Sequence, residues 1–212
     1  MIVVFITLEG VEGSGKTTIA KGLIKILLDN GYEAIYTREP GGNKIAEQIR
    51  NVILDIDNTD MDPRTESLLY AAARRQHLVD VIEPALKAGK IVICDRFIDS
   101  SIAYQGYARK IGPELIESIN DFATHGKRPD LTFLIDVKPE VGLARINKDE
   151  NREVNRLDLE TLDFHQSVYN GYLKLVEAEK NANRMKRVSG ERVVAEIVTE
   201  VYQIIKARME HE

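Results

Sequence analysis

The chain has 212 residues, of which 43% are hydrophobic and 30% charged, and its formal net charge is -5. This length suits one compact domain with an insertion or flap, and it allows a core that needs no disulfide or metal support. The balance of 29 Lys and Arg against 34 Asp and Glu excludes a general basic field for wrapping nucleic acid. The ordinary Gly and Pro content also excludes collagen-like, low-complexity and wholly disordered chains.

The start of the chain and its single cysteine indicate a cytoplasmic protein without membrane association. Residues 1–6 lack the basic start and long apolar stretch of a signal peptide, and no apolar run approaches the ~18 residues that span a bilayer. Cys94 lies within an apolar run, so we expect a buried, unreactive thiol. The four histidines show no metal-ligand spacing, and His77 and His165 are expected to serve packing or a surface.

Strands and helices are expected to alternate along the chain. Short apolar runs rich in β-branched residues indicate the strands, and apolar residues three or four apart indicate the helices. The expected strands cover 2–8, 33–37, 90–94, 131–137 and 185–188. The expected helices cover 15–30, 44–54, 63–87, 113–126, 159–181 and 190–209, with a short one beginning at 139. Asp62 marks the start of the third helix, because this N-cap residue is followed by a proline.

This alternation predicts an α/β fold with a parallel five-stranded sheet and helices on both faces. Right-handed crossovers place all strand carboxyl ends at one edge of such a sheet, where ligands bind. No internal repeat or linker interrupts the chain, so we expect a single domain over residues 1–212. A charged segment follows the fourth strand, and we expect it to form a small lid over residues 146–158.

The most specific motif follows the first strand. Residues 10–17 read Gly-Val-Glu-Gly-Ser-Gly-Lys-Thr and match G-x-x-x-x-G-K-[ST] at every fixed position. Glycines in such a loop let backbone N–H groups converge on phosphate oxygens at a helix N-terminus. Lys16 is expected to bridge the β- and γ-phosphates, and Thr17 to give its hydroxyl to Mg²⁺. The motif predicts binding of a nucleoside triphosphate such as ATP through Gly10, Val11, Glu12, Gly13, Ser14, Gly15, Lys16, Thr17 and Thr18.

The phosphoryl group could pass to water or to a second substrate. A GTPase would carry Asn-Lys-x-Asp late in the chain, whereas residues 147–150 read Asn-Lys-Asp-Glu within a charged segment. A mechanical ATPase would need coupling domains, for which this length leaves no room. A switch that binds ATP without useful turnover is a further alternative, and it would release ADP at a rate that no acceptor stimulates.

Basic and aromatic side chains gather where the predicted strands end. Arg38 follows the second strand and Arg96 follows the third, while Arg74 lies one turn after Tyr70 on the long helix. Taken singly, each arginine could equally form an ordinary surface ion pair. Together they suit an acceptor that carries its own phosphate, because arginine forks bind a dianion better than lysines do. A kinase for another nucleotide, or for an unphosphorylated deoxynucleoside, is the alternative.

The neighbouring side chains suit a nucleobase and a metal ion. Tyr70 offers a ring for stacking, and Arg74 and Gln105 can hydrogen-bond to base edges. Asp95 could position Mg²⁺ or its waters, or it could hold Arg96 in place. Both roles stay open for this residue. The expected metal ligands are therefore Thr17 and Asp95.

Four segments of the chain form a specific combination. They read Leu-Glu-Gly-Val-Glu-Gly-Ser-Gly-Lys-Thr at 8–17, Arg-Glu-Pro-Gly-Gly at 38–42, Asp-Arg-Phe-Ile-Asp-Ser-Ser at 95–101 and Ala-Tyr-Gln-Gly at 103–106. This combination resembles the thymidylate kinase family, the dTMP kinases of bacteria. The resemblance extends over essentially the whole chain, including Pro-Asp-Leu at 129–131 and Asn-Arg-Leu at 155–157.

The resemblance implies a three-layer P-loop NTPase fold and the reaction of ATP with dTMP to give ADP and dTDP, with Mg²⁺, in dTTP biosynthesis. It also implies a homodimer. The positions that match the family's dTMP contacts are Glu12, Arg38, Arg50, Tyr70, Arg74, Arg96, Ser101, Tyr104 and Gln105. In the family, the arginines 38, 50 and 96 surround the acceptor phosphate and the transferred group. Tyr70 replaces a stacking ring that is usually Phe.

The other matched positions surround the base and the sugar. By resemblance, Arg74 bonds a thymine carbonyl, and Ser101 and Gln105 make the other base contacts. Tyr104 crowds the sugar 2′ position, which favours deoxyribose, and Glu12 reaches toward the acceptor sugar.

The resemblance also implies which groups act in the transfer. In family members of this bacterial type, the lid supplies an arginine that the P-loop lacks. The chain agrees, because no arginine lies between Gly10 and Lys16, while Arg152 and Arg156 lie in the expected lid. Which of these two acts in the transition state stays open. The expected catalytic residues are Lys16, Arg96, Arg152, Arg156 and Glu12.

Overall fold

The computed structural model describes residues 4–148 and 154–210. Five parallel strands form one sheet in the order β2-β3-β1-β4-β5. They are β1 (Phe5–Glu9), β2 (Ala34–Arg38), β3 (Ile91–Asp95), β4 (Leu131–Asp136) and β5 (Met185–Ser189). The predicted parallel five-stranded α/β fold is confirmed.

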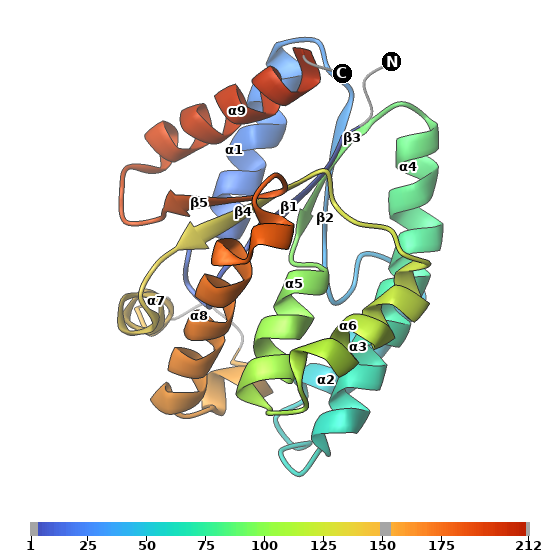
Figure 1. Ribbon diagram of the computed structural model, residues 1–212, viewed down its shortest axis with the longest axis vertical. Coiled ribbons are helices and arrows are strands. Elements are labelled where there is room, and N and C mark those ends of the chain that lie inside the picture. The colour runs from blue at the N-terminus through green and yellow to red at the C-terminus, as the bar shows by residue number, and fades with distance from the viewer. Residues whose placement is uncertain (1–3, 149–153, 211–212) are drawn as a thin grey trace.

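Helices cover both faces of the sheet (Figure 1). The α-helices are α1 (Lys16–Asp29), α2 (Lys44–Leu54), α3 (Pro63–His77), α4 (Glu83–Lys87), α5 (Ile98–Ser101), α6 (Pro113–Thr124), α7 (Pro139–Ile146), α8 (Leu162–Glu177) and α9 (Val194–Glu210). Two π-helical segments, η1 (Leu78–Ile82) and η2 (Ile102–Ala108), and two 3₁₀ turns, η3 (Arg156–Leu159) and η4 (Glu179–Asn181), complete the description. None of the described helices is both long and apolar enough to cross a membrane.

The helix boundaries follow local capping signals. The Asp62 side chain accepts hydrogen bonds from the Arg64 and Thr65 backbone N–H groups, so the predicted N-cap of α3 is confirmed. The expected helix over 63–87 exists as α3, η1 and α4 in succession. The expected helix over 159–181 is divided instead, because Thr161 caps a new helix by accepting from the Phe164 N–H.

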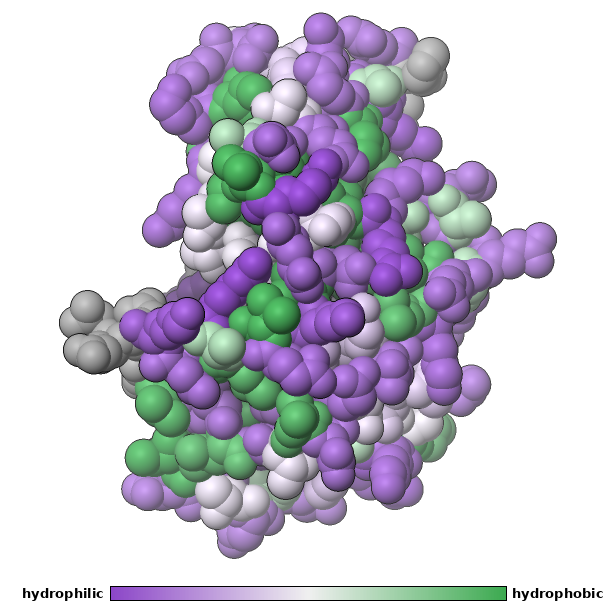
Figure 2. All heavy atoms as spheres, turned by 90° about the vertical axis from the view of Figure 1, so that its left-hand side faces the viewer, coloured by the Kyte–Doolittle hydropathy of each residue, from purple (hydrophilic) through white to green (hydrophobic). Residues whose placement is uncertain are grey.

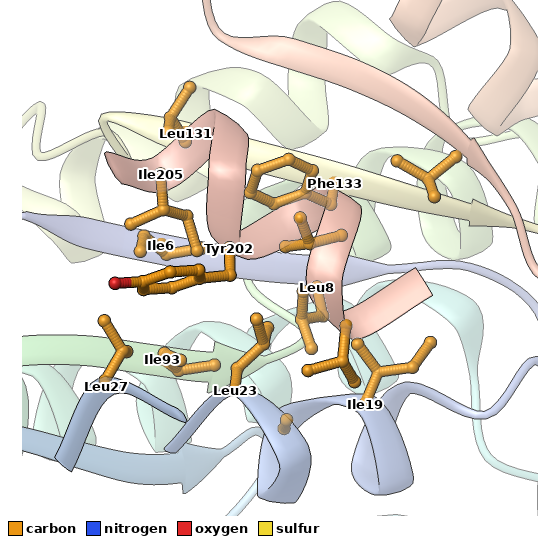
Figure 3. Close-up of a cluster of buried hydrophobic side chains, with 14 of the residues drawn as sticks. Ile6, Leu8, Ile19, Leu23, Leu27, Ile93, Leu131, Phe133, Tyr202 and Ile205 are labelled. Atoms are coloured by element: carbon orange, nitrogen blue, oxygen red, sulfur yellow. The ribbon is translucent and has the colours of Figure 1, made fainter. Parts of the chain in front are cut away.

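The larger core fills the space between the sheet, α1 and α9. Strand residues alternate between the two faces, so Ile6 and Leu8 point toward this core while Phe5 packs into the core on the opposite face. Figure 3 shows side chains of α1 and α9, Leu23 and Tyr202 among them, converging on the strands. Cys94 is buried in the opposite core, as predicted.

Polar side chains dominate the side of the molecule that carries α7, α8 and α9, where hydrophobic ones occur in small separate groups (Figure 2). Several of the large exposed hydrophobic side chains lie on three helices that pack side by side, α2, α3 and α6 (Figure 1). They are Ile45, Val52, Leu68, Leu115 and Phe122.

The core between the sheet and α1 predicts the cost of a truncation. Leu23→Ala removes a side chain with no solvent exposure from a close-packed cluster and leaves a cavity. We expect the free energy of unfolding to fall by about 2–5 kcal/mol. Urea denaturation measures this change, with the exposed Leu28→Ala on the same helix as the matched control. Equal losses in the two variants would contradict the description of this core.

Candidate active site

A cavity of about 270 Å³ opens at the carboxyl edge of the sheet. The loops after β1, β2 and β3 converge there, as expected for a parallel sheet. The predicted site residues that line it are Glu12, Gly13, Lys16, Thr17, Arg38, Arg50, Tyr70, Arg74, Asp95, Arg96, Ser101, Tyr104 and Gln105. Residues that line it without having been predicted are Glu39, Pro40, Leu54, Ser100, Asn155 and Leu157.

The P-loop after β1 holds Lys16 against its own backbone. The Lys16 ammonium donates to the carbonyl oxygens of Gly10 (3.1 Å) and Val11 (2.9 Å) and to the Ser14 hydroxyl (3.1 Å). Burial and the nearby Arg96 lower the pKa of Lys16 to about 8. Gly15 precedes α1 and caps it with no side chain, so the backbone N–H groups at this helix N-terminus suit an anion.

The P-loop also rests directly on α7. A Cβ atom on Gly13 would overlap the Gly142 carbonyl, and a Cβ atom on Gly142 would overlap the Glu12 carbonyl. Only glycine at both positions allows the two backbones to touch in this way. The remaining predicted phosphate-binding residues, Gly10, Val11, Ser14, Gly15 and Thr18, lie in the same loop and the first turn of α1 rather than in the cavity lining.

Arg96 links the P-loop to the helices on the opposite side of the cavity. Its guanidinium donates to the Glu12 carboxylate (3.0 Å) and to the Gly10 carbonyl (2.9 Å), and it lies 5.1 Å from the centre of the Tyr104 ring. The backbone φ of Arg96 is +69°, a left-handed conformation that is uncommon for a residue with a side chain. The guanidinium of this residue lies against the P-loop.

Glu12 is buried and remains ionised. Burial alone would raise its pKa, but Arg96, His165 and Lys16 outweigh that effect and hold the pKa of Glu12 well below its usual range. Its Oε1 atom accepts from Arg96 and from the Tyr104 hydroxyl (2.6 Å). His165, expected to serve packing or a surface, is buried and places Nδ1 3.4 Å from Oε2 of Glu12. No local sequence pattern connects these two residues, which are far apart in the chain.

Arg74 is a buried donor group in the lining of the cavity. Its Nε donates to Glu39 (2.8 Å), and its other two nitrogens donate to Ser101, Asn120 and the Phe97 carbonyl. A guanidinium has five N–H groups, so among the described residues one N–H of Arg74 has no partner. Glu39 also accepts from His77 Nδ1 (3.0 Å), which fixes the carboxylate.

Arg38 and Arg50 line the cavity and are partly exposed to solvent. Arg38 donates to the Pro40 carbonyl (2.8 Å) and pairs with Glu47 (3.0 Å), and Arg50 donates to the same carbonyl (3.0 Å). Asp95, at the end of β3, accepts from the Thr17 hydroxyl at 2.7 Å. The two expected metal ligands are therefore neighbours.

Of the two arginines in the expected lid, the structure describes one. Arg152 lies outside the described residues. Arg156 is buried away from the cavity lining, where it donates to the Ile53 carbonyl (2.9 Å) and the Glu66 carboxylate (2.5 Å). Glu66 was not among the predicted site residues. Its spacing of four residues from Tyr70 and eight from Arg74 places all three along one side of α3.

Glu9 is a further buried carboxylate that was not among the predicted site residues. It accepts from the Phe97 N–H (2.8 Å), the Ser100 hydroxyl (2.5 Å) and the Tyr172 hydroxyl (3.1 Å). Burial, together with the nearby Asp99, raises the pKa of Glu9 from 4.5 to about 7. The folded protein therefore retains this proton at pH values where the unfolded chain has lost it.

This difference predicts a pH-dependent stability. Between about pH 4.5 and 7 the unfolded chain binds fewer protons at this site, so the free energy of unfolding falls as the pH rises. Glu9→Gln mimics the neutral acid, so the free energy of unfolding of this variant should fall less steeply as the pH rises. The difference in slope between the two proteins is at most about 1.4 kcal/mol per pH unit. Urea denaturation of both proteins at pH 5 and 7.5 measures the difference. Identical pH profiles would contradict this prediction, and Glu33→Gln on the surface is the control.

Comparison with known proteins identifies the family. The thymidylate kinase family model matches residues 8–201. The thymidylate kinase of Clostridium novyi is 59% identical over 202 residues, covering 95% of this chain and 98% of the relative, and that of Halalkalibacterium halodurans is 55% identical over 97% of both. The crystal structure of thymidylate kinase from Ehrlichia chaffeensis is similar with a TM-score of 0.77 at 33% identity, covering 95% of this chain and 98% of that one. The chain belongs to the thymidylate kinase family.

Proposed function

We propose that this chain transfers the γ-phosphoryl group of ATP to dTMP, giving ADP and dTDP for dTTP biosynthesis. The observation that carries the proposal is one cavity that joins the P-loop to all nine residues matching the family's dTMP contacts. The names of relatives that are 50–59% identical over nearly the whole chain support the same reaction.

The basic end of the cavity suits the two phosphates. Lys16 and the N–H groups before α1 would hold the ATP phosphates. Arg38, Arg50 and Arg96 would hold the acceptor phosphate, because all three line the same cavity. Two anions repel each other until cations neutralise them, so this arrangement would bring donor and acceptor into line.

The other end of the cavity suits a base and its sugar. Tyr70 would stack on thymine, and the N–H of Arg74 that lacks a partner among the described residues would donate to a thymine carbonyl. Ser101 and Gln105 would complete the base contacts. Glu12 and Tyr104, which hydrogen-bond to each other, would lie beside the deoxyribose.

The residues present fit Mg²⁺. This ion prefers oxygen ligands and takes only one or two from a protein when phosphates supply others, and the Thr17 hydroxyl and Asp95 carboxylate lie together. Among the described residues, no group of three His, Cys, Asp or Glu side chains suits a different metal site. Thr17 and Asp95 would hold Mg²⁺, which when bound neutralises charge on the phosphates.

We further propose that residues 146–158 act as the lid and supply the arginine that the P-loop lacks, as in the bacterial type. Arg156 is buried on Glu66 and Ile53, an arrangement that suits an anchor for this segment. Arg152 is therefore our candidate for the transition-state arginine. Both assignments rest on the resemblance and on the burial of Arg156.

We also propose a cytoplasmic homodimer that needs neither nucleic acid nor membrane. The exposed hydrophobic side chains of α2, α3 and α6 are the best surface for a second copy, because these helices lie next to one another (Figure 1). The net charge of -5 supports no general attraction to nucleic acid.

The first test is ADP release with ATP and Mg²⁺ in the presence of dTMP, dUMP, AMP, CMP, GMP or thymidine. We expect strong stimulation by dTMP, weaker stimulation by dUMP, and none by the others, because a 5-methyl group is worth only about 1–3 kcal/mol in an apolar pocket. Stimulation by a different nucleotide would show that the proposed contacts with thymine are wrong. No stimulation by any acceptor would favour an ATP-binding switch.

A second test should distinguish the roles of the two lid arginines. Arg152→Ala should lower kcat by a factor on the order of 10³, with the free energy of unfolding unchanged. Arg156→Ala should instead destabilise the fold by about 3–5 kcal/mol, because it removes one of the two arginines that neutralise the buried Glu66. Steady-state kinetics and urea denaturation measure the two effects. A stable Arg156→Ala protein with the larger loss of kcat would reverse the assignment.

A further inference from the structure

Glu66 is a buried carboxylate next to Gln105, which lines the cavity. It lies on α3, has no solvent exposure, and does not line the cavity itself. Its Oε1 atom accepts a hydrogen bond from the side-chain amide nitrogen of Gln105 at 2.7 Å. Arg109 donates to both of its oxygens, at 3.3 and 3.1 Å, and Arg156 donates to Oε2 at 2.5 Å. Every direct polar contact of Glu66 with these side chains is therefore with a donor.

The surroundings keep Glu66 ionised. Burial acts to raise its pKa, but Arg109, Gln105 and Arg156 outweigh burial, so the pKa of Glu66 lies below its usual value. Glu160 pairs with Arg109 at 2.5 Å, so two acids and two arginines balance in charge. An ionised carboxylate only accepts hydrogen bonds, and so its neighbour must present a donor to it.

This requirement decides which way the Gln105 amide faces. The amide nitrogen is held against Glu66, and among the described residues no donor bonds to the amide oxygen. Gln105 lines the cavity, so the oxygen is the polar atom that it offers to a ligand. The position therefore presents a hydrogen-bond acceptor, although a glutamine could in principle present a donor.

An acceptor at this place discriminates between pyrimidines. Thymine and uracil carry an N–H donor at ring position 3, whereas neutral cytosine has an acceptor lone pair there. With cytosine, the Gln105 amide oxygen would face another acceptor, so no hydrogen bond forms and both buried polar groups lack a partner. We propose that Glu66 is a positioning residue that fixes the orientation of the Gln105 amide and thereby the preference of the cavity for bases with an N–H at position 3. This inference rests on the proposed function, because it takes the base to lie against Gln105.

The test compares dTMP with 5-methyl-dCMP, which keeps the methyl group, sugar and phosphate and differs only at positions 3 and 4 of the ring. In Glu66→Gln, the new side chain can offer either its oxygen or its nitrogen to Gln105, so the orientation is no longer imposed. We expect the ratio of kcat/KM for dTMP to that for 5-methyl-dCMP to fall at least tenfold. If turnover of 5-methyl-dCMP is too slow, its KI against dTMP replaces kcat/KM.

A double-mutant cycle separates this role from simple support of the fold. Gln105→Met should lower the ratio by itself, and adding Glu66→Gln to it should change the ratio no further. If Glu66 only supported the fold, its replacement would reduce kcat/KM for both nucleotides equally and leave the ratio unchanged. That result would overturn the inference. Arg74 would also discriminate between the two bases at position 4. Because Arg74 is the same in every variant, its contribution cancels when the ratios of the variants are compared.

Loss of one buried charge could unfold Glu66→Gln, so a charge-balanced pair is included. Glu66→Gln with Arg109→Met removes one negative and one positive charge, and Arg109→Met alone is its matched control. Thermal unfolding shows which proteins are folded. We expect the ratio to fall in the double variant and not in Arg109→Met, and equal ratios would overturn the inference. If the unmodified protein does not phosphorylate dTMP, the proposed function has failed instead.

Discussion

Charge pairing between buried arginines and buried carboxylates organises the site. Arg74 pairs with Glu39 and Arg96 with Glu12, in each case at 3.0 Å or less. Removing a guanidinium from water costs several kcal/mol unless an acid and further hydrogen bonds compensate it. A cavity for anions needs these cations, and so it also needs the acids behind them. Each acid also holds its arginine in place by accepting a hydrogen bond from the guanidinium.

The parallel sheet delivers these pairs to one place. β1 ends at Glu9, β2 ends just before Glu39 and β3 ends at Asp95, so three neighbouring strands each bring an acid to the same edge. The residue next to two of these acids is an arginine, Arg38 beside Glu39 and Arg96 beside Asp95. The order of the strands therefore assembles charged residues from distant parts of the chain, and helices α2 and α3 add Arg50 and Arg74 to the lining of the same cavity.

The sequence alone predicted the sheet and most helices, and most of the site residues that it indicated lie together in the lining of one cavity. The fold could be predicted because the periods of strands and helices and the P-loop spacing are local signals. Of the acids behind the arginines, Glu12 was predicted, whereas Glu39 and Glu66 were missed because a buried carboxylate and a surface one look the same in a sequence. Glu66 is identified by its partners Gln105 and Arg156, which lie 39 and 90 residues away. His165 was assigned to packing or a surface for the same reason.

The central position of β1 has a consequence for synthesis of the protein. β1 pairs with β3 on one side and β4 on the other, and the Phe5 N–H donates to Asp130 at 2.7 Å, across 125 residues of chain. The ribosome adds roughly 5–20 residues per second, so both edges of this apolar strand stay unpaired for several seconds at least. The P-loop that follows β1 therefore has no scaffold until most of the chain has been made. A message truncated before β4 would yield a chain with an exposed strand edge, a substrate for chaperones and proteases rather than a partial enzyme.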